Sequence, residues 1–242
     1  MRLRVATLLI PGILFSSALA SEVSRPLTLQ EVVRQMDERD RALSASLVQY
    51  TCLRRYMLNN RRFHQTAELR VRITYSSSGH KPFEVLSERG LSVIRQRVLR
   101  RMLEAEEEAS RGEMRARTRI TPLNYDFQLL GSEMQQGRLA YVLEVTPKSV
   151  GKFLLRGRIW IDSEEFAIVR VEATPAQKPS ALIYNIHVVQ QYAKVGPVWL
   201  PLYNRSMSDS FIFGYTDVTI DSSDYQVTQK PIEPPAQPSA GL

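Results

Sequence analysis

The pattern of apolar and polar positions begins with a helix. Leu29, Val32, Val33, Met36 and Leu43 recur at intervals that place side chains on one face of an α-helix. The segment Thr28-Leu29-Gln30-Glu31 has the form of a capping box, in which the Thr hydroxyl and the Glu carboxylate satisfy free backbone N–H groups. We therefore predict an amphipathic helix from Thr28 to about Ser44.

After this helix the hydrophobic period changes to two, which indicates strands. Apolar side chains share one face of segments 47–58 and 66–75: Val48, Tyr50, Cys52, Tyr56 and Leu58 in the first, and Ala67, Leu69, Val71, Ile73 and Tyr75 in the second. Asn59-Asn60 supplies a turn between them. The two segments predict an antiparallel hairpin, and Phe83 to Glu88 predicts a third strand.

Helical spacing returns in residues 91–111. The predicted apolar stripe consists of Ile94, Val98, Met102, Ala105 and Ala109. Four arginines precede four glutamates along this segment, and several pairs of opposite sign fall three or four residues apart. The polar face is therefore either solvated and self-paired, or an edge that attracts anions. We predict that this helix ends at Gly112.

From residue 120 onward strand patterns dominate, separated by Pro- and Gly-containing turns. The expected strands lie within 120–136, 139–145, 155–162, 166–173, 183–192, 198–207 and 210–220. With the earlier segments this gives about eight to ten sequential strands and two early helices, and two amphipathic helices can cover one apolar face of such a sheet. The predicted fold class is α+β: an open antiparallel β half-barrel with two or more helices covering its concave face.

Both ends of the chain differ from this pattern. Residues 1–20 combine Arg2 and Arg4, a short apolar core and Ala18-Leu19-Ala20, which together are typical of a signal peptide cleaved near Ala20. We interpret residues 21–27 as a flexible start, 28–228 as one domain and 229–242 as a Pro-rich disordered tail. Because no later segment is long and apolar enough to span a bilayer, we do not expect an integral membrane protein.

Charge and cysteine content narrow the classes of partner. The formal net charge of +7 would fit nucleic acid, anionic membranes or acidic proteins. Export excludes nucleic acid as the expected partner and leaves envelope lipids or proteins. Cys52 is the only cysteine, so no intrachain disulfide can form. It is either a small buried hydrophobic residue or a reactive thiol.

The sequence contains no catalytic signature. His64, His80 and His187 lie far apart and outside any metal-binding frame, so we predict neither a metal nor another cofactor. Asp162, Glu164 and Glu165 cluster at a predicted turn, where solvated carboxylates are common. A hydrolase with two catalytic carboxylates stays open at this point, because sequence does not show spatial pairing. We expect a protein that is not an enzyme.

One hairpin carries a family resemblance. Arg158-Ile159-Trp160-Ile161-Asp162, a turn at 163–165 and Ala167 to Glu172 form a strand ending in W-I-D, a tight turn and a strand with R-x-E, and Trp199-Leu200-Pro201 follows later. With the leading helix and the long strand 47–58, this pattern resembles the LolA/LolB-like superfamily of periplasmic outer-membrane lipoprotein-sorting proteins, which is related to the N-terminal domain of RseB. The resemblance covers roughly residues 28–228.

The resemblance implies a non-enzymatic periplasmic carrier whose half-barrel receives the acyl chains of a lipoprotein or another lipid. Inner- or outer-membrane envelope proteins are further expected partners. The alternative that it allows is an envelope regulator or scaffold of the same fold that binds a protein.

The resemblance also directs attention to particular residues. Family carriers use an arginine of an early strand to tie the helical lid closed, and Arg54 is the candidate here. It falls on the apolar face of 47–58 unless a bulge turns it outward, in which case Arg55 takes its place. The residues expected to form the cavity wall are Tyr50, Tyr56, Leu69, Val71, Ile73, Tyr75, Ile159, Ile161 and Phe213.

Overall fold

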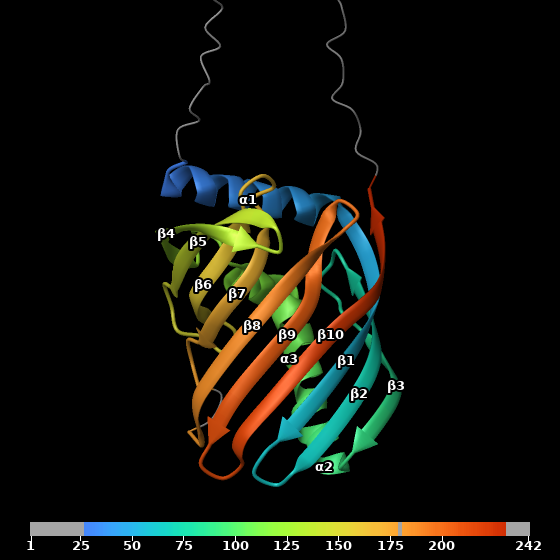
Figure 1. Ribbon diagram of the computed structural model, residues 1–242. Coiled ribbons are helices and arrows are strands. Elements are labelled where there is room, and N and C mark those ends of the chain that lie inside the picture. Colours follow the sequence, from blue (N-terminus) through green and yellow to red (C-terminus); the bar gives the residue numbers. More distant parts are fainter. Residues whose placement is uncertain (1–26, 179–180, 231–242) are drawn as a thin grey trace, which may run out of the picture.

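The computed structural model describes residues 27–178 and 181–230 (Figure 1). Its elements in chain order are α1 (Leu29–Ser46), β1 (Leu47–Asn60), β2 (Gln65–Ser76), β3 (Phe83–Gly90), α2 (Ser92–Ile94), the π-helical η1 (Arg95–Leu99), α3 (Arg100–Ser110), α4 (Gly112–Thr118), β4 (Tyr125–Gln135), β5 (Arg138–Pro147), β6 (Leu155–Asp162), β7 (Ile168–Pro175), β8 (Ile183–Val195), β9 (Val198–Ser210) and β10 (Gly214–Gln229).

The strands form one antiparallel sheet in the order β3-β2-β1-β10-β9-β8-β7-β6-β5-β4. Apart from the pairing of β1 with the last strand β10, every neighbour in the sheet is also a neighbour in sequence. The edges β3 and β4 remain separate, so the sheet curls without closing (Figure 1). The expected α+β class, an open half-barrel of about eight to ten strands, is confirmed.

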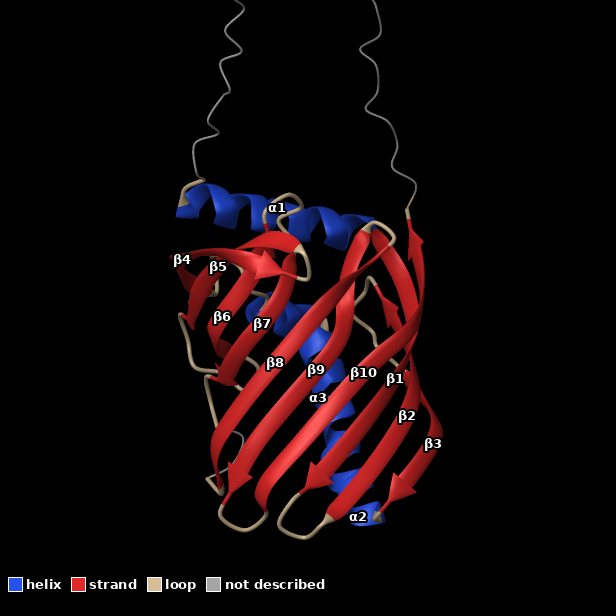
Figure 2. Ribbon diagram, in the orientation of Figure 1, coloured by secondary structure: helices blue, strands red, loops and turns tan. Residues whose placement is uncertain are grey.

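The helices cover the sheet in two places (Figure 2). Helix α1 lies across one end of the half-barrel, whereas the segment from α2 to α3 runs along the concave face. Helix α1 buries Val32, Val33 and Met36 against β4 to β7. Leu99 and Leu103 of the second helical segment pack on β1 and β2 instead. The two helices therefore build two separate cores under one continuous sheet.

Local sequence explains where α1 begins. The Oγ1 atom of Thr28 accepts a hydrogen bond from the backbone N–H of Glu31 at 3.3 Å. The Glu31 carboxylate accepts one from the backbone N–H of Thr28 at 2.7 Å. The predicted capping box is thus present, and the helix extends two residues beyond its predicted end.

The second helix departs from the prediction. Its fully buried side chains are Leu99 and Leu103, which were not in the predicted stripe of Ile94, Val98, Met102, Ala105 and Ala109. Of that stripe, Ile94, Val98 and Met102 are partly buried and pack against the same core. The π-helical stretch η1 inserts an extra residue into one turn and so rotates all later positions around the axis. The helix breaks at Arg111, near the predicted end, and Gly112 then begins α4, which the sequence analysis did not predict.

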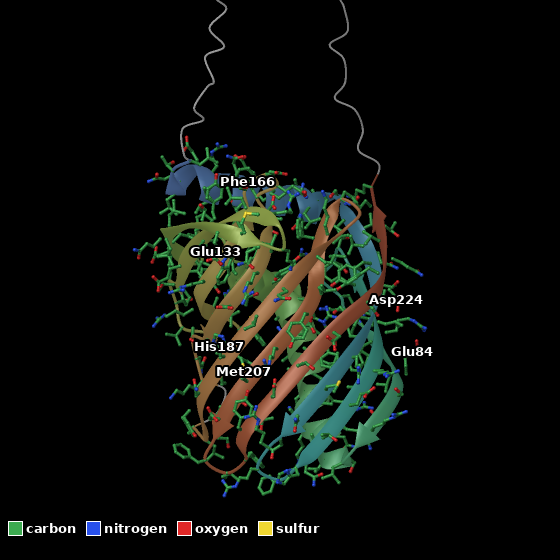
Figure 3. The ribbon with its side chains drawn as sticks, viewed as in Figure 1. Glu84, Glu133, Phe166, His187, Met207 and Asp224 are labelled. Atoms are coloured by element: carbon green, nitrogen blue, oxygen red, sulfur yellow. The ribbon has the colours of Figure 1, made fainter. Side chains whose placement is uncertain are left out.

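The central strands carry the least covered part of the sheet. None of the side chains of β8, Ile183–Val195, is fully buried. His187 of β8 and Met207 of β9 are paired in register and lie side by side (Figure 3). Both are partly exposed, and so are Val188 and Gln190, which lie on the opposite, concave face because successive strand residues alternate. Empty space on the concave side is therefore expected beside β8 and β9.

The expected signal peptide (1–20) lies outside the described residues, as do all but Leu27 of the flexible start (21–27) and all but Gln229 and Lys230 of the tail (229–242). Gln229 belongs to β10, one residue past the expected end of the domain. Among the described helices, none has the length and apolar character needed to cross a membrane.

Candidate functional site

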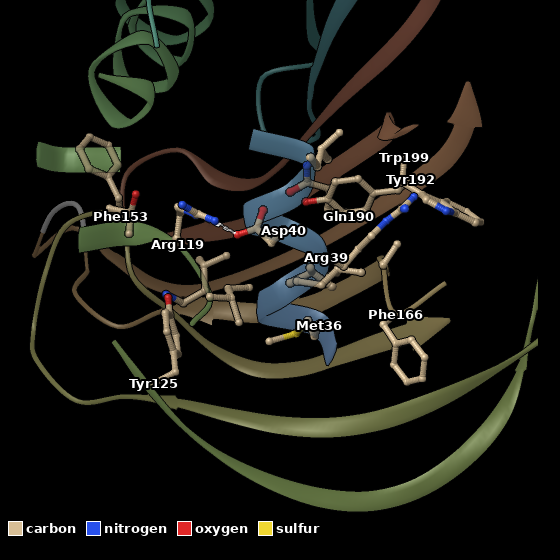
Figure 4. A pocket seen from close by; sticks show the side chains of 17 residues that line it. Met36, Arg39, Asp40, Arg119, Tyr125, Phe153, Phe166, Gln190, Tyr192 and Trp199 are labelled. Atoms are coloured by element: carbon tan, nitrogen blue, oxygen red, sulfur yellow. Dashed lines mark hydrogen bonds and ion pairs between the residues drawn. The ribbon is translucent and has the colours of Figure 1, made fainter. Parts of the chain in front are cut away.

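A pocket of about 320 Å³ lies between α1 and the sheet (Figure 4). Helix α1 forms one wall, and β6 to β9 form the opposite one. Most of its lining is apolar or aromatic: Met36, Leu43, Ile120, Tyr125, Phe153, Leu155, Phe166, Ala167, Ile168, Val171, Tyr192 and Trp199. We call it the α1 pocket. Its volume is at the lower end of the range that small-molecule sites occupy.

Charged side chains mark the rim of the α1 pocket. Arg119 Nε donates to Asp40 Oδ2 at 2.8 Å, which ties the segment after α4 to α1 (Figure 4). Arg39 of α1 donates to Glu165 at 3.4 Å and thereby reaches the turn between β6 and β7. The α1 pocket therefore has an apolar interior and a charged rim.

A second pocket, of about 280 Å³, lies between α3 and the central strands. We call it the α3 pocket. Its lining is more polar: Arg54, Met102, Glu106, Val188, Gln190, Pro201, Tyr203, Asn204, Ser206, Ile220 and Ser222. Gln190 of β8 lines both pockets. The two spaces therefore adjoin at this residue, and together they follow the uncovered middle of the sheet.

Arg54 forms the charged end of the α3 pocket. Its side chain is 3% exposed and points inward, so the inward alternative of the sequence analysis is the one observed. Arg54 Nη1 donates to both carboxylate oxygens of Glu106 on α3, at 2.5 and 2.7 Å. Lys81 Nζ pairs with the same carboxylate, and Tyr56 donates to it at 3.2 Å. Glu106 thus connects β1 and the β2–β3 loop to α3.

Electrostatics keep Glu106 and Arg54 ionised. Burial alone would raise the pKa of Glu106, but the charges of Arg54 and Lys81 outweigh it and lower that pKa. Burial raises the pKa values of Tyr50, Tyr56 and Cys52, which therefore stay neutral. Burial and the neighbouring charge of Arg54 lower the pKa of Lys81, whereas Arg54 and Glu106 form the ion pair at the centre of the cluster.

The guanidinium of Arg54 is only partly satisfied. Its Nε and Nη2 atoms are buried and have no hydrogen-bond acceptor among the described residues. Nε and Nη2 are the pair that Arg138 and Arg205 use to bind Asp162 and Asp217. Buried N–H groups without acceptors are rare and costly. The free N–H groups of Arg54 favour an oxygen-bearing group in the α3 pocket.

The residues predicted as cavity wall occupy other places. Eight of them are packed into the two cores and line neither pocket: Tyr50, Tyr56, Leu69, Val71, Ile73, Tyr75, Ile159 and Ile161. Phe213 lies in the turn between β9 and β10 and is 55% exposed. Helices cover the inward faces of β1, β2 and β6 at these positions, and a covered face becomes core. The pockets lie where that cover ends, which strand periodicity does not reveal.

No catalytic arrangement is evident among the candidates. Asp162 is 1% exposed, so it is not the solvated carboxylate that its turn position suggested. It accepts hydrogen bonds from Arg138 and from the backbone N–H groups of Glu164 and Glu165, which fix the β6–β7 turn. Within the described ranges, His, Cys, Asp and Glu side chains form no group of three suited to a metal. Cys52 is buried and has a raised pKa, which does not favour a reactive thiolate.

Comparison with known proteins gives one family match. Residues 120–223 match the model of a family of unknown function (DUF5686), which covers less than half of the chain. This region contains β4 to β9 and the first part of β10, and thus the sheet wall of the α1 pocket. No curated protein matches the sequence.

Several solved structures are similar in fold. One is a domain described as an outer membrane lipoprotein-sorting protein from Vibrio parahaemolyticus, with 12% identity, 81% of this chain and 92% of that chain covered, and a TM-score of 0.42. Another is a LolA superfamily protein from Nitrosomonas europaea, with 13% identity, 85% and 96% covered, and a TM-score of 0.41. The MucA/MucB complex from Pseudomonas aeruginosa matches at 11% identity, 81% and 93% covered, and a TM-score of 0.23.

Proposed function

We propose that this chain is a non-enzymatic carrier or binding protein for acyl chains of lipoproteins or other lipids in the cell envelope. In this proposal residues 1–20 direct export to the periplasm and are removed near Ala20. The observation that carries the proposal is the apolar α1 pocket with its charged rim, which adjoins the more polar α3 pocket at Gln190.

The physical basis is burial of hydrocarbon. Each methylene group moved from water to an apolar site contributes about 0.8 kcal/mol. Phe153, Phe166 and Trp199 offer such surface while remaining partly exposed in the described chain. A polar group attached to the acyl chain would lie at the rim beside Arg119 or reach past Gln190 toward Arg54. An amphiphile with an anionic or carbonyl-bearing end therefore satisfies both pockets.

We further propose that Arg54 acts as a tie for a helical lid. Its bond to Glu106 holds α3 against the concave face, where α3 bounds one side of the α3 pocket. Movement of α3 away from the sheet would enlarge this space, and that movement requires the bond between Arg54 and Glu106 to break. A ligand oxygen that competes for Arg54 would weaken the tie.

The pocket is tested with a dansyl-labelled fatty acid titrated into the purified chain. We expect saturable binding with a rise in dansyl fluorescence. Gln190→Trp places a large side chain where the pockets meet and should weaken binding about tenfold. Gln191→Trp is the matched control, because the next residue of a strand points to the opposite face. Absence of saturable binding, or equal weakening by both variants, would contradict the proposal.

The tie is tested separately with Arg54→Leu. We expect faster release of the dansyl probe in a stopped-flow displacement experiment. Arg55→Leu serves as control, since Arg55 is 43% exposed and pairs with Glu68 on the other face. If Arg54→Leu folds and releases the probe at the rate of the unmodified protein, Arg54 is not a tie.

A second candidate function is binding of a protein partner by a regulator or scaffold. The observation that favours it is the edge strand β4, where Leu130 and Met134 are exposed. An edge strand offers free backbone groups to an added strand. Native mass spectrometry of the protein purified from its own envelope separates the two. Co-purified lipid supports the carrier, and a lipid-free chain that crosslinks to one envelope protein supports the regulator.

A further inference from the structure

The end of the sheet opposite α1 carries an unusual pair of turns (Figure 1). In the β9–β10 turn, three consecutive apolar residues are exposed: Phe211 at 67%, Ile212 at 49% and Phe213 at 55%. Phe63, in the adjacent β1–β2 turn, is also exposed. Turns normally contain polar residues, and a run of exposed apolar residues needs a functional reason.

These side chains are held in an ordered arrangement. Asn60 Nδ2 donates to the carbonyl oxygen of Phe213 at 2.8 Å, and Arg62 Nη1 donates to that of Phe211 at 3.0 Å. Ser210 Oγ accepts hydrogen bonds from the backbone N–H groups of Ile212 and Phe213. The two turns therefore form one unit, which we call the aromatic tip (residues 61–64 and 211–213).

Surrounding side chains extend this surface and give it charge. The rings of Tyr184 and Phe211 lie 4.6 Å apart, so β8 contributes to the apolar area. Arg61 stacks over Tyr215, and Arg62 lies near the ring of Phe63. Neither Arg61 nor Arg62 forms an ion pair with another described residue, whereas Arg205 further along β9 is paired with Asp217. The tip thus combines exposed aromatic rings with two cations that lack a carboxylate partner.

We propose that the aromatic tip docks this protein on an anionic lipid surface. Phenylalanine and isoleucine at a protruding end can enter the region between headgroups and acyl chains, while flanking arginines remain at the level of the phosphates. Charge complementarity favours this occupant, because the unpaired guanidiniums match anionic headgroups. Docking would bring the protein to a bilayer by a surface remote from the α1 pocket, and the proposal does not depend on what that pocket binds.

The test is flotation of the full chain with vesicles of phosphatidylcholine containing phosphatidylglycerol, and with vesicles of phosphatidylcholine alone. We expect preferential binding to the anionic vesicles, weakened by salt. The double variant Phe211→Ser/Phe213→Ser should bind at least about tenfold more weakly. Arg61→Gln and Arg62→Gln should each lose about fivefold on anionic vesicles alone.

Two controls keep the test specific. Leu123→Ser/Val150→Ser removes two apolar side chains that are at least as exposed but lie outside the tip, and it should bind as the unmodified protein does. A Phe213→Trp variant should show a blue shift of its emission on anionic vesicles. Equal binding to both vesicle types, or unchanged binding of a folded tip variant, would overturn the proposal. Dansyl fatty acid binding by the tip variants distinguishes loss of docking from loss of the pocket.

Discussion

Helices α1 and α3 pack on the same sheet by different chemistry. Around α1, the core of β4 to β7 consists of apolar residues such as Leu143, Val145 and Ile159. Around α3, the core of β1 to β3 is also apolar but adjoins Arg54, Lys81 and Glu106, all held within the fold. We call these the α1 half and the α3 half. Apolar side chains can pack in many orientations, whereas a buried charge needs a partner of opposite charge or a hydrogen-bond partner at a defined position. The α3 half is therefore the part in which a ligand oxygen could compete with Glu106 for Arg54.

Loss of core volume in the α1 half should have the largest effect on stability. Ile159 is fully buried, so Ile159→Ala removes methylene groups and leaves a cavity. We expect the free energy of unfolding to fall by about 4 kcal/mol, measured by urea denaturation. Leu123→Ala is the control: this side chain is 82% exposed, and its loss should change stability by no more than about 0.5 kcal/mol.

Loss of one charge in the α3 half should come second. Glu106→Ala leaves Arg54 and Lys81 buried without their counter-ion. We expect a loss of about 3 kcal/mol, toward the lower end for a broken buried pair because the Glu106 side chain is one-third exposed. Glu104→Ala, on the same helix but on its exposed face, should change stability by less than about 0.5 kcal/mol. Equal effects of the two variants would mean that the charge cluster does not stabilise the α3 half.

The contrast between the halves also marks what sequence could predict. Alternation in 47–58 and 66–75 predicted β1 and β2, and the capping box predicted the start of α1, because local rules decide these features. The stripe of the second helix was predicted only in part: Ile94, Val98 and Met102 pack against the core, but the fully buried positions differ because the π-helical stretch is not visible as a spacing rule. The sequence analysis therefore did not identify Leu99 and Leu103 as core residues.

The site was less predictable than the fold. The position of Arg54 on an apolar face was a usable signal, and the structure places that side chain inward. Its partner Glu106 was one of several glutamates on an expected polar face, but it lies one turn after Met102 and faces Arg54. The pocket residues Phe153, Phe166 and Trp199 come from distant segments. Their meeting depends on where α1 stops covering the sheet, which is a property of the packed chain.

Acid should affect the α3 half through Glu106. The folded state holds the pKa of Glu106 below its unfolded value, so the unfolded state binds a proton first as the pH falls. Stability contributed by this group is present at neutral pH and is lost below about pH 5, at up to about 1.4 kcal/mol per pH unit. In Glu106→Gln the slope of the free energy of unfolding against pH should lose the contribution of one titrating proton. In Glu104→Gln this slope should be unchanged. Identical slopes in urea denaturation series across pH would contradict the assignment.

Capping offers a smaller test of the same contrast. The Thr28 hydroxyl caps α1, and Thr28→Ala should cost about 1 kcal/mol. Because α1 forms a wall of the α1 pocket, hydrogen exchange should accelerate first in the first turn of α1 and leave α3 unchanged. Thr28→Ser, which keeps the hydroxyl, should restore both stability and protection. Uniform acceleration in both helices would indicate that the two halves open as one unit.

The smallest expected effect is a gain in stability rather than a loss. The second helical segment starts after Leu91, which is exposed and makes no capping hydrogen bond through its side chain. Leu91→Ser supplies an oxygen for a free backbone N–H group and should stabilise the protein by about 0.5 kcal/mol or more. Leu91→Ala, which shortens the side chain without adding an acceptor, is the control. If α3 leaves the sheet to admit a ligand, the missing cap at Leu91 makes that movement easier. Leu91→Ser should then also slow the exchange of the dansyl fatty acid. A gain in stability without slower exchange would mean that the lid opens from its other end, at Ser110.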